Sequence, residues 1–295
     1  MNNRLTITVF VLLIALLSLI AASIGIFSRG GPGPFEYESI RGETVNVYGE
    51  GVYKHMSAEV APQGIAQDYV TLFLAIPLLL ISLLRARKRS LRGRFLLAGT
   101  LFYFLVTYLF YLVMAMYNEL FLVYTALLGL SFFAFSLVMF SISPEQLPDW
   151  FKDTTPVTVT GGFLIVNSLM IGSLWLGVIV PPLADGSIIP QQAEHYTTLI
   201  VQGLDLGLLL PLSFLSGLLL TLKKPFGYLL APTYFVFLSI MMTALIAKII
   251  AMGLLGQTIF PVIFIIPTIT VISIICTGIL LKNIKDDGFN SLNER

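Results

Sequence analysis

Residues 5–27 read LTITVFVLLIALLSLIAASIGIF, a continuous apolar run that contains no charged side chain. A transmembrane helix needs about 20 mostly apolar residues to cross the hydrocarbon core of a bilayer, so this run is long enough to span a membrane. Seven further runs meet the same criterion: 67–84, 95–117, 119–141, 158–181, 198–221, 227–254 and 258–281. The sequence therefore predicts an all-α, polytopic membrane helix bundle with about eight transmembrane helices.

The composition of the whole chain agrees with lipid as its solvent. Of the 295 residues, 57% are hydrophobic and 11% are charged, whereas about 25% of residues are charged in an average soluble domain. The net charge of +1 gives no reason to expect a nucleic acid as a partner. Cys276 is the single cysteine, so the chain has no internal disulfide or dithiol centre.

The first span has two interpretations. Arg4, the apolar run and the small residues 21–23 form a pattern that also occurs in cleaved signal peptides. The run is longer than an ordinary signal core, so we favour an uncleaved transmembrane anchor over residues 1–27. The chain then divides into this anchor, an extracytoplasmic outer segment (28–66), a seven-helix membrane core (67–281) and a cytoplasmic tail (282–295).

Basic residues predict the orientation, because cytoplasmic loops of membrane proteins carry an excess of Lys and Arg. If the N-terminus is cytoplasmic, most of the 17 basic residues fall on the cytoplasmic side. Segment 85–94 holds the densest group, and among the loop residues only Arg29, Arg41 and Lys54 then lie outside. We therefore expect a multi-pass protein of the cell membrane with both termini in the cytoplasm.

The outer segment contains a predicted β-hairpin. Residues 43–48 and 52–55 are β-prone runs on either side of the turn at 49–51, and two such runs around a Gly-rich turn favour a hairpin. An isolated hairpin is only marginally stable in water, so we expect it to lean on the outer ends of the helices. It serves either as a lid or as a surface elaboration without a direct role.

Two pairs of spans resemble one another. Residues 77–82 and 96–100 read PLLLIS and LLAGT, and residues 211–216 and 229–233 read PLSFLS and LLAPT. A basic loop joins the two runs of each pair. We interpret this similarity as an internal duplication into two parallel four-helix halves, as in transporters built from repeats. Chance similarity between short apolar runs is the alternative.

Ionisable and amide side chains within or beside the spans are the candidate site residues. Such groups are expensive to place in hydrocarbon and therefore normally face protein or water. Under the predicted topology they gather in the outer half of the membrane: Asp205, Gln202, Asp68, Lys248, Asn118 and Glu119. We predict an outward-opening polar cavity for a substrate or ion, with Asp205 near its floor.

These residues also have structural interpretations. Asp68 and Glu119 can sit at the membrane interface in water, and Lys248 can extend its stem outward to solvent. Asp205 lies deeper and can form a buried pair with Lys248. A mid-span proline, Pro211, removes a backbone hydrogen bond beside Asp205, which favours a central, irregular helix at this position.

No pattern in the chain identifies a catalysed reaction or a cofactor. The two histidines, His55 and His195, are too far apart in sequence for zinc-ligand spacing. No phosphate-binding loop and no nucleophile elbow occur. We therefore expect no metal and no cofactor, and the sequence favours a protein that is not an enzyme.

Three functions remain open at this stage. The first is a small-solute transporter or permease subunit, whose partners would be the lipid bilayer, a small solute and an unidentified subunit. The second is a non-catalytic membrane sensor or interaction protein that uses the outer segment. The third is an intramembrane enzyme that acts on a lipid-linked substrate.

Overall fold

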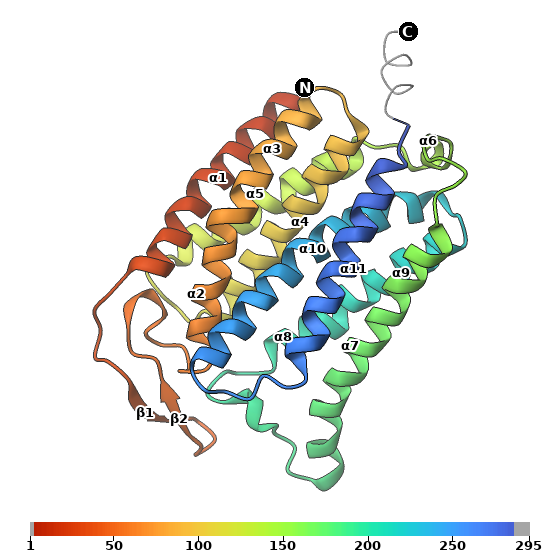
Figure 1. Ribbon diagram of the computed structural model, residues 1–295. Helices are drawn as coiled ribbons and strands as arrows, with labels where there is room; N and C mark the ends of the chain where they lie inside the picture. Colours follow the sequence, from red (N-terminus) through yellow and green to blue (C-terminus); the bar gives the residue numbers. More distant parts are fainter. Residues whose placement is uncertain (1–2, 286–295) are drawn as a thin grey trace.

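The computed structural model describes residues 3–285 and confirms the predicted membrane helix bundle (Figure 1). Eight helical spans in this part of the chain are long and apolar enough to cross a membrane. The uninterrupted ones are α1 (Asn3–Phe27), α4 (Leu91–Met114), α5 (Phe121–Phe140), α7 (Val157–Asp185), α10 (Pro225–Leu254) and α11 (Val262–Lys282). Residues 286–295, most of the predicted tail, lie outside the described range.

The remaining two spans each contain a π-helical segment. In the first, α2 (Ala61–Val70) leads through the π-helical residues Thr71–Ala75 into α3 (Ile76–Arg87). In the second, α8 (Ile200–Leu204) leads through Asp205–Leu209 into α9 (Leu210–Thr221). A short helix, α6 (Leu147–Trp150), lies between α5 and α7.

Helix α2 begins six residues earlier than the apolar run predicted. Pro62 occupies the first turn, where a proline loses no helical hydrogen bond and its fixed φ suits the helix. The apolar count missed this turn because Gln63 and Gly64 interrupt it. As a consequence Asp68 lies about two turns inside the helix rather than at its end.

Helix α10 lies at the centre of the bundle. It packs against α2, α4, α9 and α11, and its residues 231–238 are all buried. Helix α4 approaches it closely because Gly99 has no side chain: a Cβ there would lie 2.4 Å from Cβ of Val236. A helix surrounded by protein can carry an ionisable residue that faces other side chains instead of lipid.

The two ends of the bundle differ in what they carry. Helix α1 begins and α11 ends at one end, which we call the termini end (Figure 1). The turn between α3 and α4, within the basic segment 85–94, also lies there. The two β-strands lie at the opposite end, the β-hairpin end. The described chain therefore starts and finishes on the same side of the bundle, as an even number of spans requires.

The β-hairpin forms, but only one of its two strands was predicted: residues 44–47 lie within the predicted run 43–48, whereas the partner strand lies upstream of it instead of downstream. Strand β1 (Phe35–Glu38) pairs antiparallel with β2 (Thr44–Val47). The predicted second strand is instead a 3-10 turn at Gly51–Tyr53. The connection between β1 and β2 is closed by the Ser39 hydroxyl, which accepts hydrogen bonds from the backbone N–H groups of residues 41 and 43.

The glycines that suggested a hairpin turn serve a different purpose. A Cβ at Gly49 would lie 1.8 Å from the carbonyl oxygen of Gly33, and one at Gly51 would lie 2.6 Å from Oγ of Ser28. Both glycines also have positive φ, which favours glycine. They allow the chain to pass close to its own upstream backbone. The next residues, Val52 and Tyr53, are buried, and this turn contacts α1.

Two helix pairs share unusual backbone features at a constant spacing. We call residues 61–114 (α2–α4) the first helix pair and residues 200–254 (α8–α10) the second. In both, a π-helical segment precedes a proline, the turn contains a residue with positive φ, and a glycine starts the returning helix. The matching positions lie 134 residues apart: Thr71 and Asp205, Pro77 and Pro211, Arg89 and Lys223, Gly93 and Gly227.

The glycine contacts make this correspondence specific. A Cβ at Gly93 would lie 2.6 Å from the backbone nitrogen of Ala86, and one at Gly227 would lie 2.3 Å from that of Leu220. Ala86 and Leu220 are themselves 134 residues apart. The shared geometry covers these two helix pairs, and it places Leu97 opposite Ala231, one residue away from the register that the Leu-Leu-Ala matches suggested. A duplication into two four-helix halves stays a prediction.

Candidate functional site

Asp68 on α2 lies in a closed hydrogen-bonded pocket. Its side chain is 1% exposed. The Tyr53 hydroxyl donates to Oδ2, and the Tyr111 hydroxyl lies 2.9 Å from Oδ1 and 2.9 Å from the carbonyl oxygen of Gly64. Hydrogen bonds of this kind are what makes a buried carboxyl group tolerable. Asp68 therefore joins the outer segment, α2 and α4 in one polar centre.

A glycine on the neighbouring helix makes room for this carboxyl group. A Cβ on Gly25 of α1 would lie 1.8 Å from Oδ2 of Asp68 and 2.9 Å from the Tyr53 hydroxyl. Burial and the nearby Asp68 raise the pKa of Tyr53 well above its usual value, so Tyr53 stays protonated and remains a donor. The outer segment thus contributes a side chain, Tyr53, that packs between helices α1 and α2.

A second polar cluster lies beside Asp68. Gln67 Nε2 donates to the hydroxyls of Tyr103 and Thr107, at 2.7 and 3.2 Å. Tyr103 also shares a hydrogen bond with Thr71, the first residue of the π-helical segment, at 2.9 Å. The amide oxygen of Gln67, Oε1, is buried and has no hydrogen-bond partner among the described residues. The cluster ties α2 to α4 through side chains that all lie inside protein.

Asp205 occupies the matching region of the second helix pair, but its surroundings are more open. It is the first residue of the π-helical segment Asp205–Leu209 and is half-buried. Its Oδ2 accepts a hydrogen bond from Nε1 of Trp175 on α7, at 2.8 Å. Because π-helical turns often occur at functional sites, the combination of such a turn with an ionisable residue marks this position.

Lys248 is the third ionisable residue of this group and lies on the central helix α10, which packs against both α2 and α9. Its side chain is half-buried. Within residues 3–285 it makes no hydrogen bond and no ion pair. Helix α2 thus carries Asp68, the π-helical segment after α8 carries Asp205, and α10 carries Lys248. No salt bridge joins these three side chains.

Two of the other three predicted site residues lie in the turn between α4 and α5, and the third has no polar side-chain contact. Asn118 caps the α4–α5 turn, where its Oδ1 accepts from the backbone N–H of Leu120 at 2.9 Å. Glu119 is exposed and forms an ion pair with Lys54, Oε1 to Nζ 2.6 Å. Gln202, one turn before Asp205, is half-buried, and its side chain makes no hydrogen bond in the described part of the chain.

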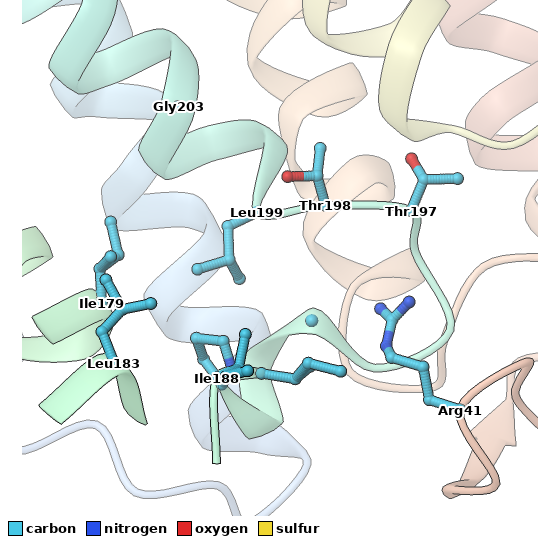
Figure 2. Close-up of a pocket in the computed structure, with 11 residues that line it drawn as sticks. Arg41, Ile179, Leu183, Ile188, Thr197, Thr198, Leu199 and Gly203 are labelled. Atoms are coloured by element: carbon cyan, nitrogen blue, oxygen red, sulfur yellow. The ribbon is translucent and has the colours of Figure 1, made fainter. Parts of the chain in front are cut away.

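A cavity of about 420 Å³ opens at the β-hairpin end (Figure 2). It lies between the end of α7, represented by Ile179 and Leu183, and the start of α8, represented by Leu199 and Gly203. Arg41 from the outer segment is its one charged lining residue. None of the six predicted site residues lines it, although Gly203 lies two positions before Asp205.

The loop before α8 fastens the outer segment to the second helix pair. Arg41 donates to the backbone carbonyl of Tyr196, and a ring nitrogen of His195 lies 2.9 Å from the carbonyl oxygen of His55. Burial raises the pKa of the neighbouring Glu194. On the other side, the Lys54–Glu119 pair fastens the same segment to the turn after α4. The outer segment therefore bridges the two helix pairs.

Sequence reasoning missed several residues of this site. Gly25, Tyr53 and Trp175 reach the acids from elements distant in sequence, so spacing along the chain gives no signal for them. Gln67 carried a signal, because it is a second polar residue beside Asp68 in an otherwise apolar span. Among the described residues, no group of three or more His, Cys, Asp or Glu side chains is arranged to hold a metal ion.

Comparisons with known proteins identify no relative of this chain. No family model matches the chain, and neither a curated protein nor a solved structure matches it significantly. The chain is a multi-pass membrane protein by its eight candidate spans, and its function has to be argued from its own residues.

Proposed function

We propose that the protein is a carrier or permease subunit for a small solute, with Asp205 and Lys248 as its membrane-embedded binding groups and Asp68 as the fixed counter-charge. The observation that carries the proposal is the presence of two half-buried ionisable residues within the spans, Asp205 on a π-helical segment and Lys248 on the central helix, whose side chains form no ion pair with each other. Ionisable residues within a membrane span commonly mark substrate or ion pathways.

The backbone supports this assignment. Transporters often bind their substrates where transmembrane helices are broken, and many are built from repeats. Here both helix pairs carry a π-helical segment before a proline, and Asp205 lies on one of these segments. Such a segment has backbone groups outside the regular α-helical pattern, so it can adjust when a ligand or proton binds.

The proposal includes a location and a direction. We infer a cell-membrane protein whose termini end faces the cytoplasm, because the basic segment 85–94 lies at that end. The site then lies toward the outer face, below the cavity between α7 and α8. A solute with both a cationic and an anionic group would match Asp205 and Lys248 together.

Trp175 offers a direct test, because its indole donates to Asp205. The chain has two tryptophans, so Trp150→Phe leaves Trp175 as the single fluorescent reporter. Purified full-length protein is titrated with a panel of small amino acids, amines and carboxylates, and hits are tested for uptake into liposomes. We expect a solute that changes Trp175 emission and is taken up.

The control variants separate binding from folding. Asp205→Asn is expected to remove both the emission change and uptake while the protein stays folded. Asp185→Asn, at the exposed end of the same helix as Trp175, removes the same charge and should leave both intact. Uptake that survives Asp205→Asn, or a panel without any response in emission and uptake, contradicts the carrier role of this site.

One observation favours a second function, that of an interaction protein. All four residues of β1 are exposed, and Ile40 beside it is 85% exposed. An exposed strand edge with apolar side chains is a typical surface for pairing with another chain. A photo-crosslinker at position 40 in native membranes should then give one discrete adduct, absent when the crosslinker is at the exposed Tyr117; adducts from neither position would remove this alternative.

A further inference from the structure

The cavity at the β-hairpin end has a polar side and an apolar side (Figure 2). Arg41 from the outer segment and Thr197 lie on one side of it, and Ile179 and Leu183 of α7 lie on the other. Its volume of about 420 Å³ falls within the range of about 300–1,000 Å³ that is usual for small-molecule sites. Such sites combine mostly apolar walls with a few placed polar groups. The cavity therefore has the size and composition of a site for a small amphipathic molecule.

The arginine on the polar side is held at both its ends. The backbone N–H of Arg41 donates to Oγ of Ser39 at 3.3 Å, within the connection between β1 and β2. Its guanidinium donates to the backbone carbonyl of Tyr196, a buried residue whose hydroxyl accepts from the backbone N–H of Ser57 at 3.3 Å. This contact uses one of the five N–H groups of a guanidinium. A guanidinium that is held in place can bind a carboxylate with two parallel hydrogen bonds, so the polar side suits a carboxylate.

The apolar side is built from α7 and the loop that follows it. Ile179 and Leu183 lie four residues apart on α7 and therefore share one face of the helix. The backbone N–H of Ile188 donates to the carbonyl oxygen of Pro182 at 2.8 Å, which folds the loop back onto the end of this helix. Leu199, directly before α8, adds to the lining. These side chains form a wall that suits the alkyl part of a ligand.

The cavity lies where water reaches the bundle. Helix α7 has 29 residues, a length of about 43 Å at 1.5 Å per residue, whereas the hydrocarbon core of a bilayer is about 30 Å thick. Counted from its start near the termini end (Figure 1), the last turns of α7 therefore extend beyond the hydrocarbon. Thr197, Thr198 and Ile188 are exposed at the cavity. A ligand can thus enter from the aqueous side.

We propose that this cavity binds a small, water-soluble carboxylic acid with an apolar chain, whose carboxylate pairs with Arg41 and whose chain lies against Ile179, Leu183 and Leu199. A free fatty acid in the membrane carries the same chemical groups. The moderate volume of the cavity and its exposed lining assign the site to the soluble acid. This inference does not depend on the carrier function, because it concerns binding alone.

One glycine allows the cavity to be filled without a clash. Gly203 lines the cavity, and a Cβ there would meet no atom within 4 Å. Gly203→Leu therefore occupies cavity space while the helix keeps its contacts. Gly177→Leu on α7 is the matched control, because Gly177 also has open space around it and does not line the cavity.

A second pair of variants tests the charge. Arg41→Gln removes the cation and keeps an N–H donor for the carbonyl of Tyr196. Arg29→Gln is its control, since it removes the same charge from an exposed residue of the same outer segment that does not line the cavity. Binding is measured by isothermal titration calorimetry on the full-length protein in phosphatidylcholine nanodiscs. The probes are hexanoate, acetate and hexylamine, and hexanoate is measured again with palmitate added to the bilayer.

We expect the wild type to bind hexanoate and not hexylamine. Acetate lacks four methylene groups and should bind on the order of a hundredfold more weakly, because each buried methylene contributes about fourfold in affinity. Arg41→Gln should weaken hexanoate binding about tenfold or more, as expected for lost hydrogen bonds to a charged group, and Gly203→Leu should weaken it at least as much. Both controls should stay within about twofold of the wild type, and palmitate should have no effect.

Four results would overturn the proposal. The wild type might bind no hexanoate, or it might bind hexylamine equally well, which would mean an apolar cavity without recognition of an anion. Equal losses in a test variant and its control would mean that the acid binds elsewhere. Loss of hexanoate binding when palmitate is present would assign the cavity to a membrane acid instead.

Discussion

The first and second helix pairs have the same backbone features and different polar side chains. Both contain a π-helical segment, a proline two residues beyond it, and a glycine at which the returning helix touches the preceding one. The spacing of 134 places Gln202 opposite Asp68 and Asp205 opposite Thr71. The two acids therefore do not occupy equivalent positions. Asp68 lies one helical turn before Thr71, the residue that corresponds to Asp205.

The surroundings of the two acids differ accordingly. Asp68 is sealed between Tyr53, Tyr111 and the backbone of Gly25. Asp205 has one hydrogen bond, from Trp175, and is only half-buried. A closed polar network stabilises and rigidifies a fold, whereas an incompletely satisfied ionisable group can exchange partners. The comparison shows that the same π-helical backbone carries a closed polar network in one pair and a less completely hydrogen-bonded acid in the other.

The largest expected effect tests the shared backbone. Gly93→Ala and Gly227→Ala each place a Cβ within 2.6 Å of the backbone of the preceding helix, and a clash with backbone cannot be relieved by a rotamer change. We expect each variant to lose about 3 kcal/mol of stability or to fail to fold, as measured by thermal unfolding in detergent. Gly129→Ala on α5, with open space around it, is the control and should be neutral or slightly stabilising. A large loss at one glycine alone would break the equivalence.

The next effect compares the hydrogen bonds of the two acids. Tyr111→Phe removes a donor from the fully buried Asp68, and we expect a loss of about 1–3 kcal/mol. Trp175→Phe removes the donor from the half-buried Asp205, where solvent can compensate, so the loss should be smaller. Tyr117→Phe, at a 79% exposed tyrosine, serves as the control. The reverse order of the first two losses would mean that Asp205 is the structural acid.

A smaller effect concerns two carboxyl groups in the segments that contact the outer segment, Glu194 in the loop before α8 and Glu119 in the turn after α4. Burial raises the pKa of Glu194 in the folded state, so its contribution to stability is fully present below the unfolded pKa and is lost as the pH rises through the folded pKa. The hydrogen bond from Lys54 lowers the pKa of Glu119, so its contribution is present above the unfolded pKa and is lost as the pH falls through the folded value.

Two substitutions separate these contributions in unfolding temperatures measured from pH 4 to pH 8. Glu194→Gln should raise the stability at neutral pH relative to acid pH, and Glu119→Gln should lower it slightly, because the exposed pair is screened by solvent. Slopes of the same sign for both variants would contradict the assignments.

The smallest effect is expected at Gln202, the counterpart of Asp68. Its side chain makes no hydrogen bond within residues 3–285 and is half-buried, so Gln202→Leu should change the stability by no more than about 0.5 kcal/mol. Asp68→Leu, measured in parallel by thermal unfolding, removes the acceptor of two buried tyrosines and should be clearly destabilising. A similar loss for both variants would indicate that Gln202 belongs to a polar network of its own.

The sequence predicted the fold well because spanning a bilayer requires long apolar runs, and these are visible by counting. The predicted boundaries of the spans were less accurate than the spans themselves. Helix α2, for example, begins at Ala61 with a proline-containing first turn that is too polar to be counted in an apolar run. The strand partners were predicted wrongly because Gly49 and Gly51 look like a turn, whereas their actual role is a close crossing with residues 28 and 33.

The candidate site was predictable only in part. Asp68, Asp205 and Lys248 stood out because ionisable residues are rare in apolar spans. Their different states depend on Gly25, Tyr53 and Trp175, which reach them from elements far away in the sequence. The register of side chains between non-adjacent helices decides such contacts, and it leaves no periodic pattern in a single sequence.

Cysteine accessibility measures the difference between the two acids most directly. In a Cys276→Ser background, the variants Asp205→Cys, Lys248→Cys, Asp68→Cys and, as a control, Leu208→Cys are placed in sided membrane vesicles with a membrane-impermeant thiol reagent. Leu208 is 48% exposed on the apolar surface of the bundle. Rapid labelling of positions 205 and 248 from the β-hairpin side, with positions 68 and 208 unreactive, is the result that we predict. Labelling at 68 but not at 205 and 248, or from the termini end alone, would contradict a water-accessible site in the second helix pair.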